Sequence, residues 1–496
     1  MNTSSIIQLI VFLLYLIFML AIGVRFYIKG KKTSEGEKSY FLGGRKMGAW
    51  VTALSAGSSD MSAWALMGLP ASIYAFGIGK IWIAVGLAIG YTLSWIFEAS
   101  RLRRFSIVAD DSITIPQYLT NRFKSSSKSL QVISAIVFLV AYTVYAASSV
   151  KACGTLFESV LGIDSHIAMC IAAVIIVGYV FLGGYSAVCW TDFFQALLIL
   201  GAMMLAPIFA LFALQNGSSI AGENAATYWN AFGDPQSIIS GLGWGIGYFG
   251  MPHIIIRFMS LKSDKELKKS AKIGITWTLL ILILAAAIGI ISRLYLGFDQ
   301  GIADAGRPFI ETVTRIFPAV ISGIFLSAIL AASMSTADSQ LLAASSAFAS
   351  DVYKPVIKKG KVSDIHMVHV GRIVVLAISA IALVIALVPG TGTIMDLVEN
   401  AWGVFGAAFG PAIMLSLFWK RFNYAGAVAG IVAGACADIG ILVLGKVGVI
   451  PGTIYIYEII PGAVIGLITA IIVTLCTKKP SKEVEELFDE AVAYTD

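Results

Sequence analysis

Charged residues are scarce in this sequence. Asp, Glu, Lys and Arg make up only 13% of its 496 residues, about half the share found in soluble globular proteins. Hydrophobic residues make up 58%, and apolar runs of about 20 residues, long enough to cross a bilayer, recur along the whole length. A soluble multi-domain protein is excluded, because no core would be large enough to bury so many runs. The composition indicates an all-α polytopic membrane protein.

Cysteine and histidine are also few, and neither forms a cluster. The five cysteines stand singly in or beside apolar segments, without the spacing of a disulfide framework or a metal site, and the four histidines are equally dispersed. We therefore expect no cofactor, no transition metal and no enzyme activity. The net charge of +6 comes from short basic clusters between apolar runs, so we expect no nucleic-acid partner, and no obligatory protein partner is evident.

The apolar runs predict about thirteen spans. They cover residues 5–28, 47–72, 80–98, 128–156, 164–183, 190–214, 239–259, 273–296, 317–349, 368–389, 395–418, 424–444 and 455–476. The first run is too long for a signal peptide and has no basic residues before it, so we interpret it as a retained span. Every Lys/Arg cluster follows an odd-numbered span. The positive-inside rule then places the N-terminus outside and the C-terminus in the cytoplasm.

Glycine and proline interrupt the second and seventh spans. The second contains TALSAGSSDMSAWALMGLP (52–70), and the seventh contains GLGWGIGYFGMPHIIIRF (241–258). The two spans lie five spans apart and run in opposite directions. Interrupted spans at matching positions of oppositely oriented units indicate an inverted-repeat transporter whose binding sites lie at the breaks.

This pattern predicts six parts of the chain. They are the first span with a cytoplasmic loop (1–46), a first repeat of spans two to six (47–214), an extracellular loop (215–238), a second repeat of spans seven to eleven (239–419), spans twelve and thirteen (420–477), and a charged tail forming a short solvated helix (478–496).

Asp60 lies inside the interrupted second span, without a compensating charge nearby in the sequence. A carboxylate at membrane depth costs at least about 2.5 kcal/mol, so it should face a partner or a water-filled cavity. Two roles are open at this point. Asp60 either couples to an ion or caps the broken helix by accepting backbone N–H bonds.

Three residues of the ninth span, Ala332, Ser335 and Thr336, are spaced i, i+3 and i+4 and share one helix face. Two hydroxyls and a carbonyl oxygen suit a hard cation such as Na⁺. The alternative is packing, because Ser and Thr are common at helix interfaces in membranes.

Trp244, Tyr248 and Pro252 of the seventh span are spaced i, i+4 and i+8 and also share a face. This pattern is typical either of an aromatic packing stripe or of a wall that faces a ligand. The glycines between them should leave space beside the rings, which favours the wall. Their G-x-G-x-x-G spacing does not indicate a dinucleotide site, because no strand precedes it.

Further ionisable residues occur within or near spans: Glu98, Lys151, Asp192, Arg257, Asp338, Glu399 and Asp438. We expect most of them to be interfacial or paired. Asp192, in CWTDFFQ, is the candidate for a second ion path.

Several stretches together resemble the sodium/solute symporter family, and within it the bacterial sodium/proline symporters. They are YFLGGR (40–45), TALSAGSSDMSAWALMGLP (52–70), FLGGYSAVCWTDFFQ (181–195), GWGIGYFGMPHIIIRFM (243–259), SAILAASMSTADSQLL (327–342) and AWGVFGAAFGP (401–411). The resemblance covers nearly the whole chain. It implies the LeuT-like inverted five-plus-five repeat with flanking helices.

The resemblance also implies site residues. The sodium site would use the main-chain carbonyls of Ser58, Met61 and Ala332 and the hydroxyls of Ser335 and Thr336, with Asp60 as an essential neighbour. The residues implied for proline are Ser62, Trp64, Gly68, Tyr145, Trp244, Tyr248 and Pro252. The chain departs from the family pattern at Ser58, where alanine is usual, and at Ala63, where glycine is expected.

The function implied is secondary transport across a bacterial inner membrane, with inward Na⁺ movement driving L-proline uptake. The ligands would be Na⁺, as the only metal ion, and L-proline. One alternative is a sodium symporter for another small solute, such as another amino acid, pantothenate or a sugar. A transporter-like sensor is disfavoured by the short tail, and an ion channel by the lack of a repeated filter or charged ring.

Overall fold

The computed structural model describes residues 2–33, 36–182, 184–214, 225–359 and 361–495. Within these ranges the chain is helical, and the one β feature is an isolated bridge between Met47 and Leu261. Helices suit this composition, because a segment in hydrocarbon must pair its own backbone N–H and C=O groups. The all-α expectation is confirmed.

Ten helical segments of the described chain are long and apolar enough to cross a membrane. They comprise α1 (Thr3–Thr33), α5 with α6 (Ile81–Leu93, Ala99–Val108), α8 (Ser129–Leu161), α10 (Tyr185–Ala213), α14 (Asp264–Leu296), α17 (Ala319–Ser346), α18 (Asp364–Leu387), α19 (Ile394–Phe418), α20 (Tyr424–Lys446) and α21 (Ile459–Cys476). The other predicted spans are the two interrupted ones and α9 (Ser165–Leu182), whose apolar part is shorter. The count of thirteen stays a prediction.

Both predicted interruptions are present. The second span consists of α3 (Ala49–Asp60), a π-helical turn η2 (Trp64–Gly68) and α4 (Leu69–Phe76). The seventh consists of α12 (Pro235–Gly243), a 3-10 segment η5 (Trp244–Phe249) and α13 (Pro252–Ser260). Proline starts α13 at a position where its missing N–H costs no helical bond.

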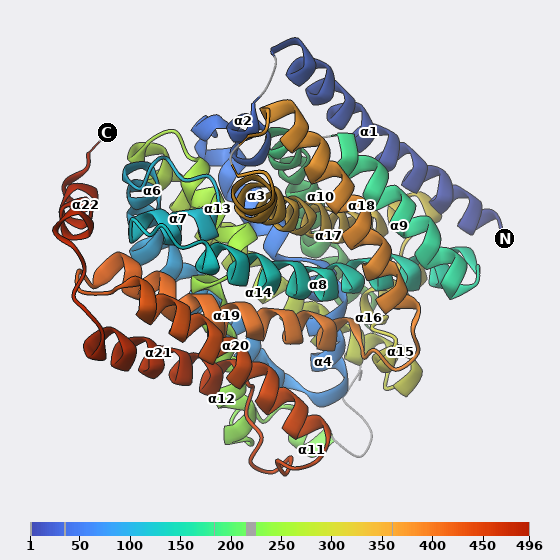
Figure 1. Ribbon diagram of the computed structural model, residues 1–496. Helices are drawn as coiled ribbons and strands as arrows, with labels where there is room; N and C mark the ends of the chain where they lie inside the picture. The colour runs from blue at the N-terminus through green and yellow to red at the C-terminus, as the bar shows by residue number, and fades with distance from the viewer. Residues whose placement is uncertain (1, 34–35, 183, 215–224, 360, 496) are drawn as a thin grey trace.

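Helix contacts in the two halves of the chain follow the same pattern. In the second span, α3 packs against α10 and α14. The equivalent seventh span packs in the same way, with η5 against α19 and α12 against α5. Likewise, α8 packs against α19 and α17 packs against α10. Figure 1 shows α3, α8 and α17 within the bundle, α1 along one flank, and α20 with α21 on another. This correspondence is the one expected of an inverted repeat.

Short helices occupy the two ends of the bundle (Figure 1). One end carries α2 (Glu37–Leu42), α7 (Ile115–Arg122) and α22 (Lys482–Ala493), and the other carries α11 (Ala225–Tyr228) and α15 (Gln300–Asp304). A further short helix, α16 (Pro308–Ile316), precedes α17. The start of α1 and the tail helix α22 lie at opposite ends.

The charged tail forms a helix as predicted, but it is not fully solvated. Its apolar face is buried and packs on α6, with the rings of Phe105 and Phe488 5.3 Å apart in an edge-on contact. The spacing of Val484, Leu487, Phe488 and Ala491 explains this contact, because residues three and four apart share a helix face.

Small residues set the close packing of the last helices. A Cβ atom at Gly434 of α20 would lie 2.2 Å from the carbonyl oxygen of Ala407 in α19, and one at Gly430 would lie 2.7 Å from Cβ of Ala470 in α21. Glycine lets helix backbones approach where no hydrophobic effect drives association. The α19–α20–α21 junction is therefore a tight contact.

Candidate functional site

The break in the second span frees backbone carbonyls of α3. Met61 has φ −78° and ψ 62°, and the Ser62 amide donates to the Asp60 carbonyl at 2.8 Å. This geometry is an inverse γ-turn centred on Met61. In an unbroken helix the Ser62 amide would instead donate to the Ser58 carbonyl. The turn therefore exposes oxygen acceptors inside the bundle.

The predicted face of the ninth span meets these acceptors. The Ser335 hydroxyl donates to the Ser58 carbonyl at 2.9 Å, and the Thr336 hydroxyl donates to the Ser59 carbonyl at 2.9 Å. Ser335 also lies 3.2 Å from the Ala332 carbonyl oxygen. All of these residues are buried. Carbonyl and hydroxyl oxygens from α3 and α17 thus converge in the type of environment that hard cations prefer.

Asp60 is tied to the seventh span through its side chain. The Tyr248 hydroxyl donates to Asp60 Oδ2 at 2.6 Å, and Trp64 Nε1 donates to the Asp60 carbonyl at 3.2 Å. Asp60 Oδ1 is buried and has no hydrogen-bond partner among the described residues. No backbone amide in the described chain donates to this carboxylate, which argues against the capping role. Its geometry links the break in α3 to the aromatic residues of η5.

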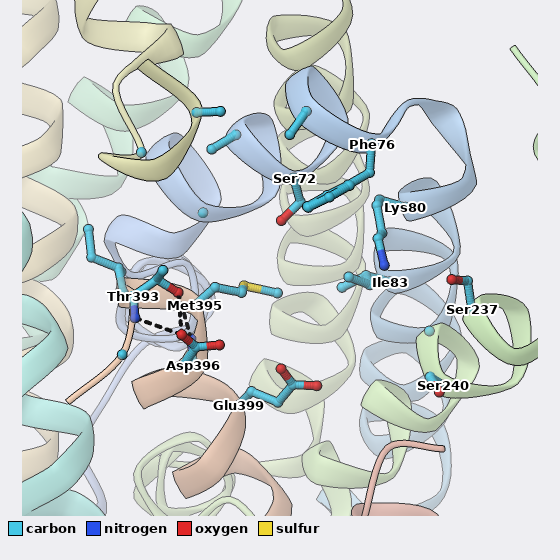
Figure 2. A pocket seen from close by; sticks show the side chains of 18 of the residues that line it. Ser72, Phe76, Lys80, Ile83, Ser237, Ser240, Thr393, Met395, Asp396 and Glu399 are labelled. Carbon is cyan, nitrogen blue, oxygen red and sulfur yellow. Dashed lines mark hydrogen bonds between the residues drawn. The ribbon is translucent and has the colours of Figure 1, made fainter. Parts of the chain in front are cut away.

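A cavity of about 740 Å³ opens beside the two breaks. Its lining includes Gly68 and Trp244 from the breaks and the charged residues Lys80, Lys151, Asp234, Asp396 and Glu399. Figure 2 shows Lys80 on one side and Asp396 with Glu399 on the other. At the edge of the cavity the Ser237 hydroxyl donates to Asp234 at 2.6 Å, and this bond lowers the pKa of the Asp234 carboxyl.

The other residues implied for proline lie deeper than this lining. The Trp64 and Trp244 rings are 6.3 Å apart, so Trp64 stands directly behind the wall. The Ser62 hydroxyl lies 3.4 Å from the Trp64 amide, and the buried Tyr145 hydroxyl lies close to Ser62. Tyr248 and Pro252 are buried as well. The structure gathers the named residues around the two breaks, with Gly68 and Trp244 facing the cavity.

Trp402 of α19 belongs to this site, although the sequence reading did not identify it. Its indole donates to the Trp244 carbonyl at 2.8 Å, and its ring lies 5.1 Å from that of Tyr248. A Cβ atom at Gly247 would lie 2.0 Å from Trp402 Nε1. Other parts of the protein thus fill the space beside the glycines of the seventh span, whereas open space beside the aromatic rings was expected.

His253 is a second residue that the sequence reading missed. Its amide donates to the Tyr142 hydroxyl at 2.8 Å, and its Nε2 lies 3.2 Å from the Ser59 carbonyl oxygen. That carbonyl also accepts from Thr336. A polar residue directly after a proline at a helix break could have indicated this position.

Asp192 of α10 is paired. Its Oδ2 atom accepts from the Ser55 hydroxyl at 2.6 Å and from Arg257 Nη2 at 3.2 Å. Its carbonyl accepts from the Ser58 hydroxyl at 3.2 Å, so the departure from alanine at position 58 adds a bond to α10. Asp192 Oδ1 has no partner among the described residues.

Known proteins are similar to this chain in sequence and in fold. The model of the Sodium:solute symporter family matches residues 40–434. The high-affinity proline transporter PutP of Bacillus subtilis is 40% identical over 479 residues, covering 95% of this chain and 98% of its own. The sodium/proline symporter of Haemophilus influenzae is 39% identical over 501 residues, covering 98% and 97% respectively.

A solved Na⁺-coupled sialic acid symporter, in a substrate-bound outward-open state, superposes with a TM-score of 0.78 at 21% identity, covering 96% of this chain and 99% of that one. The likeness confirms the expected LeuT-like architecture. The family match and the full-length relatives show that this chain belongs to the sodium:solute symporter family.

Proposed function

We propose that the protein is a sodium/proline symporter, in which Na⁺ moving inward drives uptake of L-proline. The substrate is inferred from the names of relatives about 40% identical over nearly the whole chain. The observation that carries the coupling is the junction of Ser335 and Thr336 with the carbonyls freed at the break in α3. Both the family and these relatives are transporters, so no catalytic step is required.

Sodium would bind between α3 and α17. Its proposed ligands are the carbonyls of Ser58, Met61 and Ala332 and the hydroxyls of Ser335 and Thr336. The two hydroxyls now donate to Ser58 and Ser59, so each would rotate and turn a lone pair toward the ion. Asp60 would add negative charge beside the site, at a depth where little water screens it.

Proline would bind where the cavity meets the breaks. Gly68 and Trp244 offer a wall open to the cavity, and Trp64 backs it. The remaining proposed contacts are Ser62, Tyr145, Tyr248 and Pro252. The bond between Tyr248 and Asp60 joins the two sites, so binding of either ligand would raise affinity for the other.

The orientation proposed is an outside N-terminus and a cytoplasmic C-terminus in a bacterial inner membrane. The cavity end would face outside. Ion pairs close the opposite end, where Asp111 binds Arg45 at 2.7 Å and Asp264 binds Arg103 at 3.1 Å. An open cavity at one end and ion pairs at the other are typical of one state of an alternating-access transporter.

The proposed parts keep the boundaries given above. The repeats would be 47–214 and 239–419, flanked by 1–46, 420–477 and the tail 478–496. Of the extracellular segment 215–238, residues 215–224 lie outside the described chain. Asp192 is retained as a proposed second ion path on the strength of its buried, unpartnered Oδ1 atom.

Uptake of labelled L-proline into proteoliposomes tests this function directly. We expect uptake only under an inward Na⁺ gradient, and we expect unlabelled L-proline to compete better than other amino acids, pantothenate or sugars. Uptake without Na⁺ dependence would overturn the coupling. Stronger competition by another solute would overturn the substrate while leaving a sodium symporter.

A further inference from the structure

Asp438 is a buried carboxylate that the proposed transport cycle does not use. It lies in α20, outside the two repeats, and its side chain is 0% exposed. Both of its carboxylate oxygens are buried without a hydrogen-bond partner among the described residues. An ionised carboxylate in this environment carries a large desolvation cost unless something neutralises it.

Two glycines hold Asp438 between neighbouring helices. A Cβ atom at Gly403 of α19 would lie 2.8 Å from Asp438 Oδ1, and one at Gly462 of α21 would lie 3.0 Å from Asp438 Cβ. Glu399 lies one turn before Gly403, and Glu458 lies one turn before Gly462. Residues four apart share a helix face, so both glutamates lie on the faces that carry these glycines.

The negative charges of Glu399 and Glu458 repel a negative charge on Asp438. Lys80 and Lys446 are the basic groups whose charges reach Glu399, and Asp396 adds further repulsion there. None of the ion pairs found among the described residues joins Lys80 or Lys446 to these acids. The Tyr455 hydroxyl donates to Glu458, and the Tyr457 hydroxyl donates to the Glu399 carbonyl at 2.8 Å.

The acids lack the arrangement of a metal site. Among the described residues, no group of three or more His, Cys, Asp and Glu side chains could hold a metal ion. A proton needs only one carboxylate oxygen and removes the charge outright. It is therefore the cation that fits Asp438.

The cavity gives this cluster a route to solution. Glu399, Tyr455 and Tyr457 all line it, and Figure 2 shows Glu399 there. Tyr457 also contacts the proposed proline wall, because its ring lies 5.2 Å from that of Trp244. The cluster thus borders the cavity and contacts Trp244 of the proposed proline wall.

We propose that Asp438, with Glu399 and Glu458, forms a proton-binding site that receives its proton through the cavity. A proton bound there keeps the Trp244 ring in the position that binds proline. The effect on proline rests on the proposed function, whereas the proton site itself does not. Glu458 precedes the apolar helix α21, which begins at Ile459, and there burial raises its pKa while the Tyr455 hydroxyl partly offsets the rise. A bound proton is favoured at low pH, so raising the pH on the cavity side removes it.

Loss of the proton leaves an unpaired charge in the tight α19–α20–α21 junction. We expect this charge to strain the junction and to displace Tyr457 and, through it, the Trp244 ring. Proline binding should then weaken. The KM for proline in the parent should therefore rise at least about threefold from about pH 6 to about pH 9 at saturating Na⁺. The Asp438→Asn variant should keep a nearly constant KM, because an amide cannot lose this proton.

Asp304→Asn is the matched control. It removes an exposed carboxylate that lines the same cavity but lies on α15, away from the cluster. It should keep the pH dependence of the parent. A parent KM that does not change with pH, or Asp438→Asn responding to pH as the parent does, would overturn the control of transport by this site.

Infrared spectroscopy tests the proton without transport. The parent at neutral pH should show the carbonyl band of a protonated buried carboxyl group, and this band should be missing from Asp438→Asn and retained in Glu458→Gln. Absence of the band in the parent would overturn the proton site even if proline uptake is normal. Conversely, a band together with no sodium-dependent uptake would contradict only the proposed transport function.

Discussion

At the scale of single residues, Asp60 lies between the proposed sodium site and the proposed proline site. Its carboxylate has one oxygen bound to Tyr248 and one without a partner in the described chain. A helix-capping aspartate would instead accept from backbone amides. The unused oxygen therefore suits an electrostatic role beside sodium.

A double-mutant cycle would measure this connection. We expect Asp60→Asn and Tyr248→Phe each to weaken proline binding, and the two effects to be non-additive by about 0.5–3 kcal/mol, because they remove the same charge-assisted bond. Proline binding measured at fixed Na⁺ for the parent, both single variants and the double variant gives the coupling energy. Additive effects would show that the 2.6 Å contact does not join the two sites energetically.

The two hydroxyls of α17 should determine sodium affinity. Ser335→Ala and Thr336→Ala each remove one proposed ligand, so each should raise the half-saturating Na⁺ concentration by about tenfold, equivalent to about 1.4 kcal/mol of lost ion coordination. Added Na⁺ should then restore part of the proline affinity. Sodium titrations of proline uptake give both quantities.

Ser346→Ala is the matched control for that experiment. The Ser346 hydroxyl also lies in α17 and is buried, but it donates to the Ala343 carbonyl of its own helix at 2.8 Å. Its loss should leave the sodium titration unchanged. If Ser335→Ala and Thr336→Ala behave like this control, the ion does not bind at the α3–α17 junction.

At the scale of helices, a buried ion pair joins α10 to α13. The Arg257 and Asp192 side chains are 2% and 0% exposed and lie 3.2 Å apart. Breaking a buried pair by removing one partner costs about 3–5 kcal/mol, because the remaining charge stays in the protein. The pair therefore fixes the second half of the broken seventh span against the first repeat.

The Asp192→Asn variant separates the structural role of this pair from a second ion path. A structural pair predicts a lower melting temperature with and without Na⁺, and an unchanged ratio of sodium to proline transported. An ion path predicts in addition that the stabilisation by Na⁺ shrinks. Thermal unfolding of detergent-solubilised protein across a Na⁺ series, with dual-label flux measurements, decides between the two.

The two broken helices could be predicted because their causes are local. Glycine, proline and a lone carboxylate stand within single spans, and basic clusters give each span its direction. The partners of Arg257 and Trp402 could not be predicted in this way, because Asp192 and Trp244 lie on other spans. The space beside the glycines of η5 was misjudged for the same reason, since α5 fills it at Gly245 and Trp402 of α19 fills it at Gly247.

At the scale of the molecule, the end opposite the cavity is held by carboxylates that each bind two basic side chains. Asp264 binds Arg103 and Arg104, and Asp111 binds Arg45 and Lys38. The Asp264 side chain is 15% exposed, whereas that of Asp111 is 44% exposed. Solvent screening should make the Asp264 pairs the stronger restraint on that end.

Removing these restraints should shift the protein toward the state that is open to the cytoplasm. The cavity would then close, so a cysteine at Ser72, which lines it, should react more slowly with a membrane-impermeant maleimide added outside intact cells. The background would lack the exposed Cys170, Cys436 and Cys476. We expect Asp264→Asn to slow labelling by up to about fivefold, the equivalent of about 1 kcal/mol, and Asp111→Asn to slow it less.

Asp489→Asn is the control, because it removes an exposed pair with Lys420 that joins only the tail to the same end. Equal labelling rates in all variants would show that these ion pairs do not hold the closed end, and no labelling of the parent from outside would reverse the proposed orientation.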